Sequence, residues 1–329
     1  MREKNVSLKA IASRVGCSIN TVSHALRDMD DISESLKIKI RKTAIEMGYL
    51  PNHVAQKMRK DERFVVGVFA DNFSNLYFNT LYGEFLKVFR SREELDCVLM
   101  LSEKFDIEII KKCILQRVDI IITYTFCDEN TAEFARLNNV SIIYAGSVFM
   151  YDMACLGMDA VDIDNRCGCQ LAARYFNNFH TSEKFVFVGG DYTFSRFRCD
   201  VFKDEIGKIN SSAQVDFYNI STDDIRVLYE KILGGYRSVF CFNDMIAYEM
   251  LSKLDNLVVD VRRMFPDLHI LGFDGLCEWI EGFRQISTIT IDFKMFAEKV
   301  YEVAKFRIEN PTAPPVKVTL PVTLHQRKE

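Results

Sequence analysis

Residues 7–26 read SLKAIASRVGCSINTVSHAL, and this stretch decides the fold of the amino-terminal part of the chain. Ser7 stands where an N-cap is expected, and the apolar residues that follow recur along one face of a helix: Leu8, Ile11, Ala12 and Val15. Gly16 supplies a turn, and Ser18 can cap a second helix, whose inward positions are Val22, Ala25 and Leu26. The pattern predicts two short helices joined by a glycine turn.

A third helix is predicted between Ser33, its expected cap, and Gly48, its expected stop. Its buried stripe consists of Ile40, Thr43, Ala44 and Met47. Three short helices with a glycine turn between the first two match a helix-turn-helix, although an inert bundle would show the same apolar pattern. The polar run SINT at residues 18–21 favours the helix-turn-helix, because its side chains would face outward where a major groove is entered.

Charge is unevenly distributed along the 329 residues, which carry a formal net charge of −4. Residues 1–60 hold twelve Lys and Arg against six Asp and Glu, a net charge of +6, so the remaining residues carry −10. A basic head on an acidic body is typical of a polyanion-binding module joined to a domain with another task. The charge pattern therefore agrees with the helix-turn-helix prediction.

The head resembles the DNA-binding domain of the lactose-repressor/galactose-repressor (LacI/GalR) family of bacterial transcription regulators, over residues 7–12, 16–26 and 48–52. The resemblance implies base contacts by Ile19, Asn20 and His24, and phosphate contacts by Ser7, Ser18, Thr21, Ser23 and Arg27. Asparagine suits a bidentate contact with adenine, isoleucine offers only an apolar contact, and histidine can donate to guanine. The acidic run DMDD at residues 28–31 departs from the family and would repel phosphate.

Residues 51–60, PNHVAQKMRK, resemble the hinge helix of the same family, which orders on DNA and pairs with its dimer mate. Two helical turns are too short to be stable alone, so folding of the hinge should depend on those contacts. The minor-groove residues that the resemblance implies are Val54, Ala55, Lys57, Met58 and Arg59. Met58 replaces the usual leucine and can still unstack a base step, whereas the alternative is a flexible basic tether.

The body alternates short apolar runs with amphipathic stretches, which predicts an α/β fold of parallel sheets with helices on both faces. Strands are expected at residues 65–70, 97–101, 120–123, 141–144, 185–188, 238–242 and 269–273. Helices are expected at residues 77–90, 107–115, 166–176, 197–209, 224–233 and 244–254. The body also resembles the two-lobed periplasmic-binding-protein type I domain of the same family, with two doubly wound parallel sheets.

The resemblance implies three parts in the chain: a helix-turn-helix head at residues 1–50, a hinge at 51–62 and an effector-binding and dimerisation domain at 63–329. Within that domain, we expect one lobe at about 63–161 and 290–315, and the other at about 162–289 and 316–329. A homodimer is expected, because a two-fold operator needs two heads.

An effector is expected at the carboxyl ends of the strands, between the lobes. The candidate residues that follow strands are Asp71, Phe73, Tyr77, Tyr124, Arg196, Asn243 and Asp274, with Trp279 as a further possibility. Arg196 matches a ligand-facing arginine of the family, and Arg198 takes its place if the turn is shifted by two residues. Asn243 has an alternative role as a helix cap.

The resemblance implies a repressor whose operator affinity is controlled by a sugar or sugar derivative; the alternative is a corepressor-dependent repressor or an activator that responds to a non-sugar metabolite. We expect a cytoplasmic protein, with no membrane partner, no metal and no cofactor. The ten cysteines are scattered, and only Cys167 and Cys169 are close, which favours reduced thiols. A solute receptor would lack the basic head. No catalytic motif points to an enzyme.

Overall fold

The computed structural model describes residues 7–26, 29, 31–47, 63–71, 73–92, 94–146, 156–179, 183–191, 193–258, 260–278 and 286–327. Several residues with a predicted role lie outside the described part of the chain: the hinge residues Val54, Ala55, Lys57, Met58 and Arg59, the phosphate contact Arg27, and Trp279.

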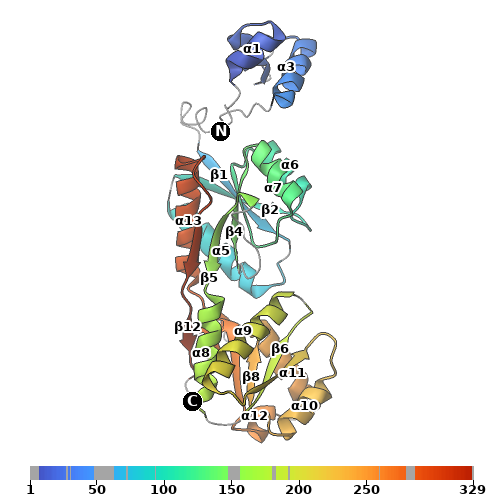
Figure 1. Ribbon diagram of the computed structural model, residues 1–329, viewed down its shortest axis with the longest axis vertical. Helices are drawn as coiled ribbons and strands as arrows, with labels where there is room; N and C mark the ends of the chain where they lie inside the picture. Colours follow the sequence, from blue (N-terminus) through green and yellow to red (C-terminus); the bar gives the residue numbers. More distant parts are fainter. Residues whose placement is uncertain are drawn as a thin grey trace.

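The amino-terminal head is the predicted set of three helices, α1 (Leu8–Val15), α2 (Ile19–Leu26) and α3 (Glu34–Glu46) (Figure 1). Ser7 caps α1 by accepting a hydrogen bond from the backbone N–H of Ala10, and Gly16 ends it with a φ of +80°, a left-handed conformation that favours glycine. The core of the head consists of Ile11, Ala12, Val22, Ala25, Ile40 and Ala44. The expected apolar faces are therefore confirmed.

Two six-stranded sheets form the body, each flanked by helices (Figure 1). The first sheet has the strand order β11-β5-β4-β3-β1-β2 and the second β12-β10-β9-β8-β6-β7. All strand pairs are parallel except that of β12 with β10. In both sheets the chain winds outward from β1 or β6 in two directions, so the predicted pair of doubly wound sheets is confirmed.

The first lobe contains β1 (Phe64–Ala70), α5 (Leu76–Ser91), β2 (Leu95–Leu101), α6 (Ile107–Leu115), β3 (Ile120–Thr123), α7 (Glu129–Leu137), β4 (Ser141–Ala145) and β5 (Asp159–Ile163). The second contains α8 (Asn165–Asn177), β6 (Lys184–Gly189), α9 (Thr193–Ile209), β7 (Gln214–Asn219), α10 (Ile225–Leu233), β8 (Ser238–Cys241), α11 (Asp244–Leu257), α12 (Val261–Met264), β9 (His269–Asp274) and β10 (Ser287–Thr290). The chain then returns through α13 (Phe293–Glu309) and β11 (Lys317–Leu320) to the first lobe and ends with β12 (Thr323–His325) in the second.

The chain thus crosses between the lobes three times, after β5, after β10 and after β11. Two expected lobe boundaries are wrong. A boundary at residues 161/162 would cut through β5, which lies wholly in the first sheet, and β11 was expected in the second lobe. The physical reason is the parallel pairing of β11 with β5, in which Val318 lies opposite Val161 and Leu320 opposite Ile163.

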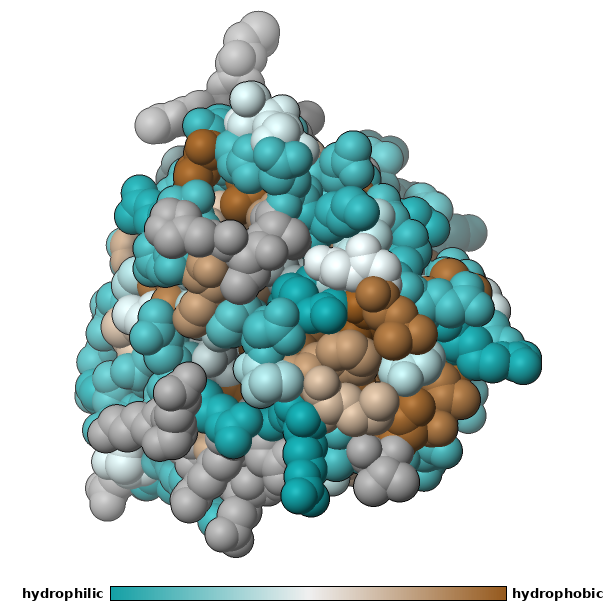
Figure 2. Space-filling view, turned by 90° about the horizontal axis from the view of Figure 1, so that it is seen from below, coloured by the Kyte–Doolittle hydropathy of each residue, from teal (hydrophilic) through white to brown (hydrophobic). Residues whose placement is uncertain are grey.

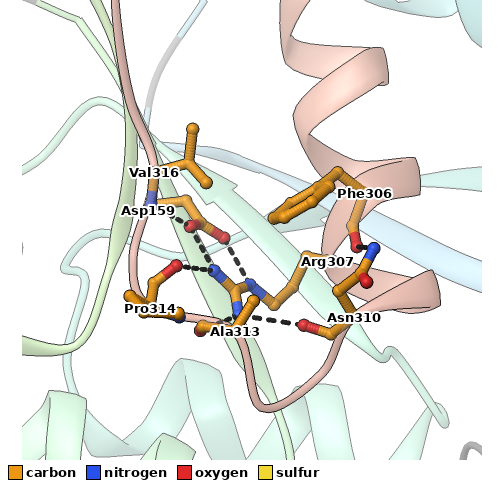
Figure 3. Close-up of polar contacts among 7 residues, drawn as sticks. All are labelled: Asp159, Phe306, Arg307, Asn310, Ala313, Pro314 and Val316. Carbon is orange, nitrogen blue, oxygen red and sulfur yellow. Dashed lines mark hydrogen bonds and ion pairs between the residues drawn. The ribbon is translucent and has the colours of Figure 1, made fainter.

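A buried ion pair fixes the return from α13 to β11 (Figure 3). Arg307 donates to both carboxylate oxygens of Asp159, over 2.7 and 2.6 Å, and also to the backbone carbonyls of Asn310, Ala313 and Pro314. The backbone N–H of Val316 donates to the same carboxylate. The start of β5 is thereby tied to the loop that leads into its neighbour β11.

The far end of the second lobe carries exposed apolar surface. Figure 2 views this end and shows hydrophobic residues gathered on one part of it. Elements at this end include α10 and α12 (Figure 1), whose residues Leu233 and Met264 are exposed. Among the described residues, no helix is long and apolar enough to cross a membrane.

Candidate DNA-binding and effector sites

The amino-terminal end of α2 presents a polar, exposed surface. Ser18 caps the helix by accepting a hydrogen bond from the backbone N–H of Thr21 over 3.0 Å, and the two hydroxyls lie 2.8 Å apart. Ile19 and Asn20, in the first turn, are exposed, and Ile19 keeps 45% of its surface although it is apolar. An exposed apolar side chain beside an exposed amide at a helix start can contact base edges in a major groove.

Of the other described residues predicted to contact DNA, Ser7 and Ser18 are exposed and three residues of α2 are less so. Thr21, Ser23 and His24 are half-buried, because they lie closer to the face of α2 that packs on the head. The Ser7 hydroxyl accepts from the N–H of Ala10 over 3.3 Å, so it caps α1. His24 holds a partner that the sequence did not predict: its Nδ1 lies 2.6 Å from Oδ2 of Asp31.

Between the two lobes, the structure brings Tyr77, Arg198 and Asp274 together. Tyr77, in the first turn of α5, is partly buried, and its ring contacts that of Phe293 with centroids 5.3 Å apart. Burial and the nearby Asp274 carboxyl raise the pKa of Tyr77 above its ordinary value, while the Arg198 guanidinium acts in the opposite direction. These electrostatic contacts join the first lobe to the second.

Arg198, not Arg196, is the arginine of this cluster. Arg196 is exposed and its guanidinium lies over the ring of Phe217 on the edge strand β7, 3.6 Å from the centroid. Arg198 is buried, and its Nη2 donates to Oδ1 of Asn165 over 2.7 Å, while Nη1 donates to the backbone carbonyl of Phe242. The two-residue shift considered from the sequence is therefore the arrangement found.

The rings of Phe242 and Phe273 hold the Arg198 guanidinium, whose carbon lies 4.4 and 3.8 Å from their centroids. Asn165 is the first residue of α8, directly after the crossing from β5. Neither Asn165 nor the two phenylalanines was predicted as part of the site. Their sequence signal was weak, since each reads as a helix start or a strand residue.

Two buried carboxyl groups lie at the carboxyl ends of β8 and β9. Burial, followed by the Asp244 carboxyl, raises the pKa of Asp274 well above its usual range, and Arg198 opposes the shift. Burial also raises the pKa of Asp244 to about 7, although Thr288 and the backbone N–H of Leu276 donate to it. Gly272 makes room for Asp244, because a β-carbon there would lie 2.0 Å from its Oδ1.

The other effector candidates lie around an aromatic group of the first lobe. Tyr124, after β3, stacks on Phe78 with ring centroids 3.7 Å apart, and its hydroxyl donates to the carboxylate of the exposed Asp71. Burial, followed by the hydrogen bond to Asp71, raises the pKa of Tyr124 to about 12. Phe73 is about half exposed and contacts the ring of Tyr82 edge-on.

Asn243 takes the alternative role considered for it. Its side-chain oxygen accepts from the backbone N–H of Ile246 over 2.9 Å, which caps α11. Within the described parts of the chain, no group of three histidine, cysteine or acidic residues is placed to hold a metal.

The chain has a small helical head with an exposed helix start, attached to two wound α/β lobes that meet around buried polar groups. This combination is typical of a DNA-binding regulator with a ligand domain. Known proteins agree. Residues 7–52 match the model of the lacI family of bacterial regulatory proteins. The HTH-type transcriptional repressor PurR of Vibrio vulnificus is 23% identical, over 92% of both chains. The regulator RegA of Clostridium saccharobutylicum is 35% identical over 72 residues, 22% of either chain.

Solved structures show the same fold. The lac repressor dimer bound to operator and the anti-inducer ONPF is 17% identical, covers 99% of both chains and has a TM-score of 0.65. A LacI-family regulator from Enterococcus faecium with bound ribose is 18% identical, covers 80% of this chain and 97% of its own, and has a TM-score of 0.65. Residues 7–52 thus match the DNA-binding domain of the lacI family, and the body has the fold of the lac repressor and of other LacI-family regulators.

Proposed function

We propose that this protein is a repressor that binds a pseudo-palindromic operator as a homodimer and changes its operator affinity when a small molecule binds between the lobes. The observation that carries the effector part is the cluster of Tyr77, Arg198 and Asp274, drawn from both lobes. The buried carboxyl groups of Asp244 and Asp274 and the buried guanidinium of Arg198 are costly to desolvate. A polar ligand that forms hydrogen bonds with these groups offsets that cost.

For the DNA part, we propose base contacts by Ile19, Asn20 and His24 and phosphate contacts by Ser7, Ser18, Thr21, Ser23 and Arg27. Exposure of Ile19 and Asn20 at the start of α2 supports the first set. The hinge contacts of Val54, Ala55, Lys57, Met58 and Arg59 belong to the same proposal on the strength of the family resemblance. Exposed apolar side chains in both lobes, such as Leu101 and Leu233, are available to a dimer interface.

For the effector, we propose a sugar or sugar derivative. The fork of donors on Arg198 suits paired hydroxyls, the oxygens of Asp274 can bond them, and the ring of Tyr77 can cover an apolar sugar face. Bound ribose in the Enterococcus faecium structure is the parallel from a related fold. In this proposal Asp71, Phe73 and Tyr124 line the first-lobe side, and Asn243 acts mainly as a cap.

The second candidate is a flat, non-sugar metabolite, acting as corepressor or activating ligand. The stack of Phe78 on Tyr124, with the half-exposed Phe73 nearby, is the observation that favours it, because aromatic rings bind planar groups well. The sign of the response separates an inducer from a corepressor. A ligand shifts the equilibrium only by its differential affinity for the two states.

The test has two stages on the full chain. Selection from a randomised duplex library gives the operator, and fluorescence anisotropy then measures its affinity with and without each member of a panel of sugars, sugar phosphates, nucleobases and amino acids. A sugar that changes operator affinity at least fivefold supports the proposal. A response to flat heterocycles alone would favour the second candidate, and the absence of any preferred duplex would refute operator binding.

A further inference from the structure

Two residues that follow α2, Met29 and Asp31, contact His24 on that helix. Nδ1 of His24 lies 2.6 Å from Oδ2 of Asp31, seven residues further along the chain. The backbone N–H of Met29 donates to the carbonyl of His24 over 3.1 Å, which is a second link between loop and helix. His24 is thereby held from two sides, by its main chain and by its ring.

Pairing with a carboxylate determines which ring atom of histidine can meet DNA. An imidazole has two nitrogens, and without a partner either one can be turned toward a base. When Nδ1 donates to Asp31, Nε2 is the nitrogen left for another contact. When the ring carries a proton on each nitrogen, both nitrogens are donors.

We propose that Asp31 is a positioning residue that holds the His24 ring so that Nε2 donates a hydrogen bond to guanine, at N7 or O6, in the major groove. The inference rests on the proposed function of sequence-specific DNA binding. It gives the acidic loop a role other than repulsion of phosphate: Asp31 weakens binding to DNA of any sequence and improves discrimination at one base pair. Guanine presents two acceptors, N7 and O6, at its major-groove edge, and an imidazole N–H can donate to either.

Among the described residues of the head, the other two acidic side chains, Glu34 and Glu46, do not offer the same contact. Glu34, at the start of α3, accepts a hydrogen bond from Lys37 over 2.8 Å. Glu46 is exposed on the last turn of α3, and its removal takes away one negative charge, as removal of Asp31 does. Glu46→Ala is therefore a matched control for the general electrostatic effect of Asp31→Ala.

The experiment compares four full-length proteins, the wild type, Asp31→Ala, Asp31→Asn and Glu46→Ala, by selection from a randomised duplex library followed by anisotropy titrations. We expect the wild type to prefer guanine at one symmetric position and Asp31→Ala to lose about tenfold of that preference, the size of one good base contact. Asp31→Asn, which keeps an acceptor without the charge, should fall between them. Replacing the guanine by 7-deazaguanine should weaken the wild type more than Asp31→Ala.

Both alanine variants should bind unrelated duplexes somewhat more tightly than the wild type, because each removes a negative charge from the head. Glu46→Ala should leave the base profile unchanged. The preference assigned to Asn20 reports whether the Asp31→Ala head is folded, since it should persist at its own position. His24→Ala should lose the same guanine preference as Asp31→Ala.

An Asp31→Ala profile that matches those of the wild type and Glu46→Ala at every position would overturn the inference and leave the proposed function standing. Loss of preference at all positions, with the Asn20 position included, would also overturn it, because Asp31 would then support the fold of the head. If the wild type itself selects no sequence, the proposed function fails and this inference fails with it.

Discussion

Replacing Arg307 by alanine should cost about 3–5 kcal/mol of the free energy of unfolding. The side chains of Arg307 and Asp159 are 9% and 2% exposed, so removal of the arginine leaves a carboxylate buried without its counter-charge (Figure 3). Asp159 keeps one donor, the backbone N–H of Val316, and three backbone carbonyls lose their hydrogen bond from Arg307, although that of Asn310 keeps the N–H of Ala313. A loss of this size lowers the ratio of folded to unfolded protein by roughly a hundredfold to several thousandfold.

An exposed pair of similar geometry provides the control. Arg136 also donates from two nitrogens to one carboxylate, that of Glu133, over 2.8 and 2.7 Å, but on the surface of α7. Arg136→Ala should cost less than about 1 kcal/mol, because water solvates the glutamate that remains. Urea unfolding followed by circular dichroism, at one fixed protein concentration, compares the two variants with the wild type.

The double variant Arg307→Met/Asp159→Leu separates the buried charge from the rest of the loss. It should recover about 1 kcal/mol or more relative to Arg307→Ala, because no charge is then left without a partner. Equal costs for Arg307→Ala and Arg136→Ala would refute the reasoning, since Asp159 would then be solvated as well as Glu133 is.

Three further predictions concern the two sites. Asn20→Ala should cost about 1–3 kcal/mol per half-site and relax base choice at one symmetric position; equal losses in affinity for all duplexes would make Asn20 a phosphate contact. Arg198→Ala should abolish the effector response in anisotropy titrations, whereas Arg196→Ala should keep it; the reverse result would restore Arg196 as the ligand arginine. Because burial raises the pKa of Asp244 from 3.8 to about 7, the folded protein holds a proton there that the unfolded chain loses first. The free energy of unfolding should therefore fall as the pH rises from about 4 to about 7, by up to about 4 kcal/mol from this group. In Asp244→Asn, the difference between the urea midpoints at pH 5 and pH 8 should be smaller by that contribution.

Elements that are apolar on their own were predictable from the sequence, and elements that depend on distant partners were not. The head helices and the central strands β1, β3, β4, β6, β8 and β9 carry uninterrupted apolar runs or clear helical stripes. In β5, by contrast, Asp159 and Asp162 interrupt the run, yet every residue of the strand is buried. Burial of Asp159 depends on Arg307, 148 residues away, and no local pattern reveals that partner.

Two edge strands, β7 and β11, were missed for a related reason, whereas the more apolar edge strand β2 was predicted. Of the residues of β7 (QVDFYN) and β11 (KVTL), only Tyr218, Asn219 and Leu320 are buried, so polar residues break the apolar signal of both strands. Helices α7 and α13 were also not predicted. The seventeen-residue α13 has enough apolar residues to predict a helix. It follows β10 (STIT), however, which is too polar to be predicted as a strand, so the alternation of strands and helices could not be followed through this part of the sequence.

The choice between Arg196 and Arg198 could not be made from the sequence, because it depends on the exact start of a helix. Side chains two positions apart on a helix point about 200° apart around its axis, so one of these arginines faces away when the other faces the lobes. The sequence places both arginines after a strand, but only the start of α9 at Thr193 fixes which one turns inward. A shift of that start by one residue would redirect both side chains.

The contacts of Arg198 extend beyond the proposed effector site. Its guanidinium is bonded to Asn165, the first residue of α8, and so to the segment by which the chain enters the second lobe from β5. It is also bonded to the carbonyl of Phe242, next to the Asn243 cap of α11. A molecule that binds Arg198 therefore meets a group already anchored to the inter-lobe crossing. Because a ligand acts through the difference in its affinity for two arrangements, an effector that binds Arg198, as proposed, would have an affinity that depends on how the lobes are set.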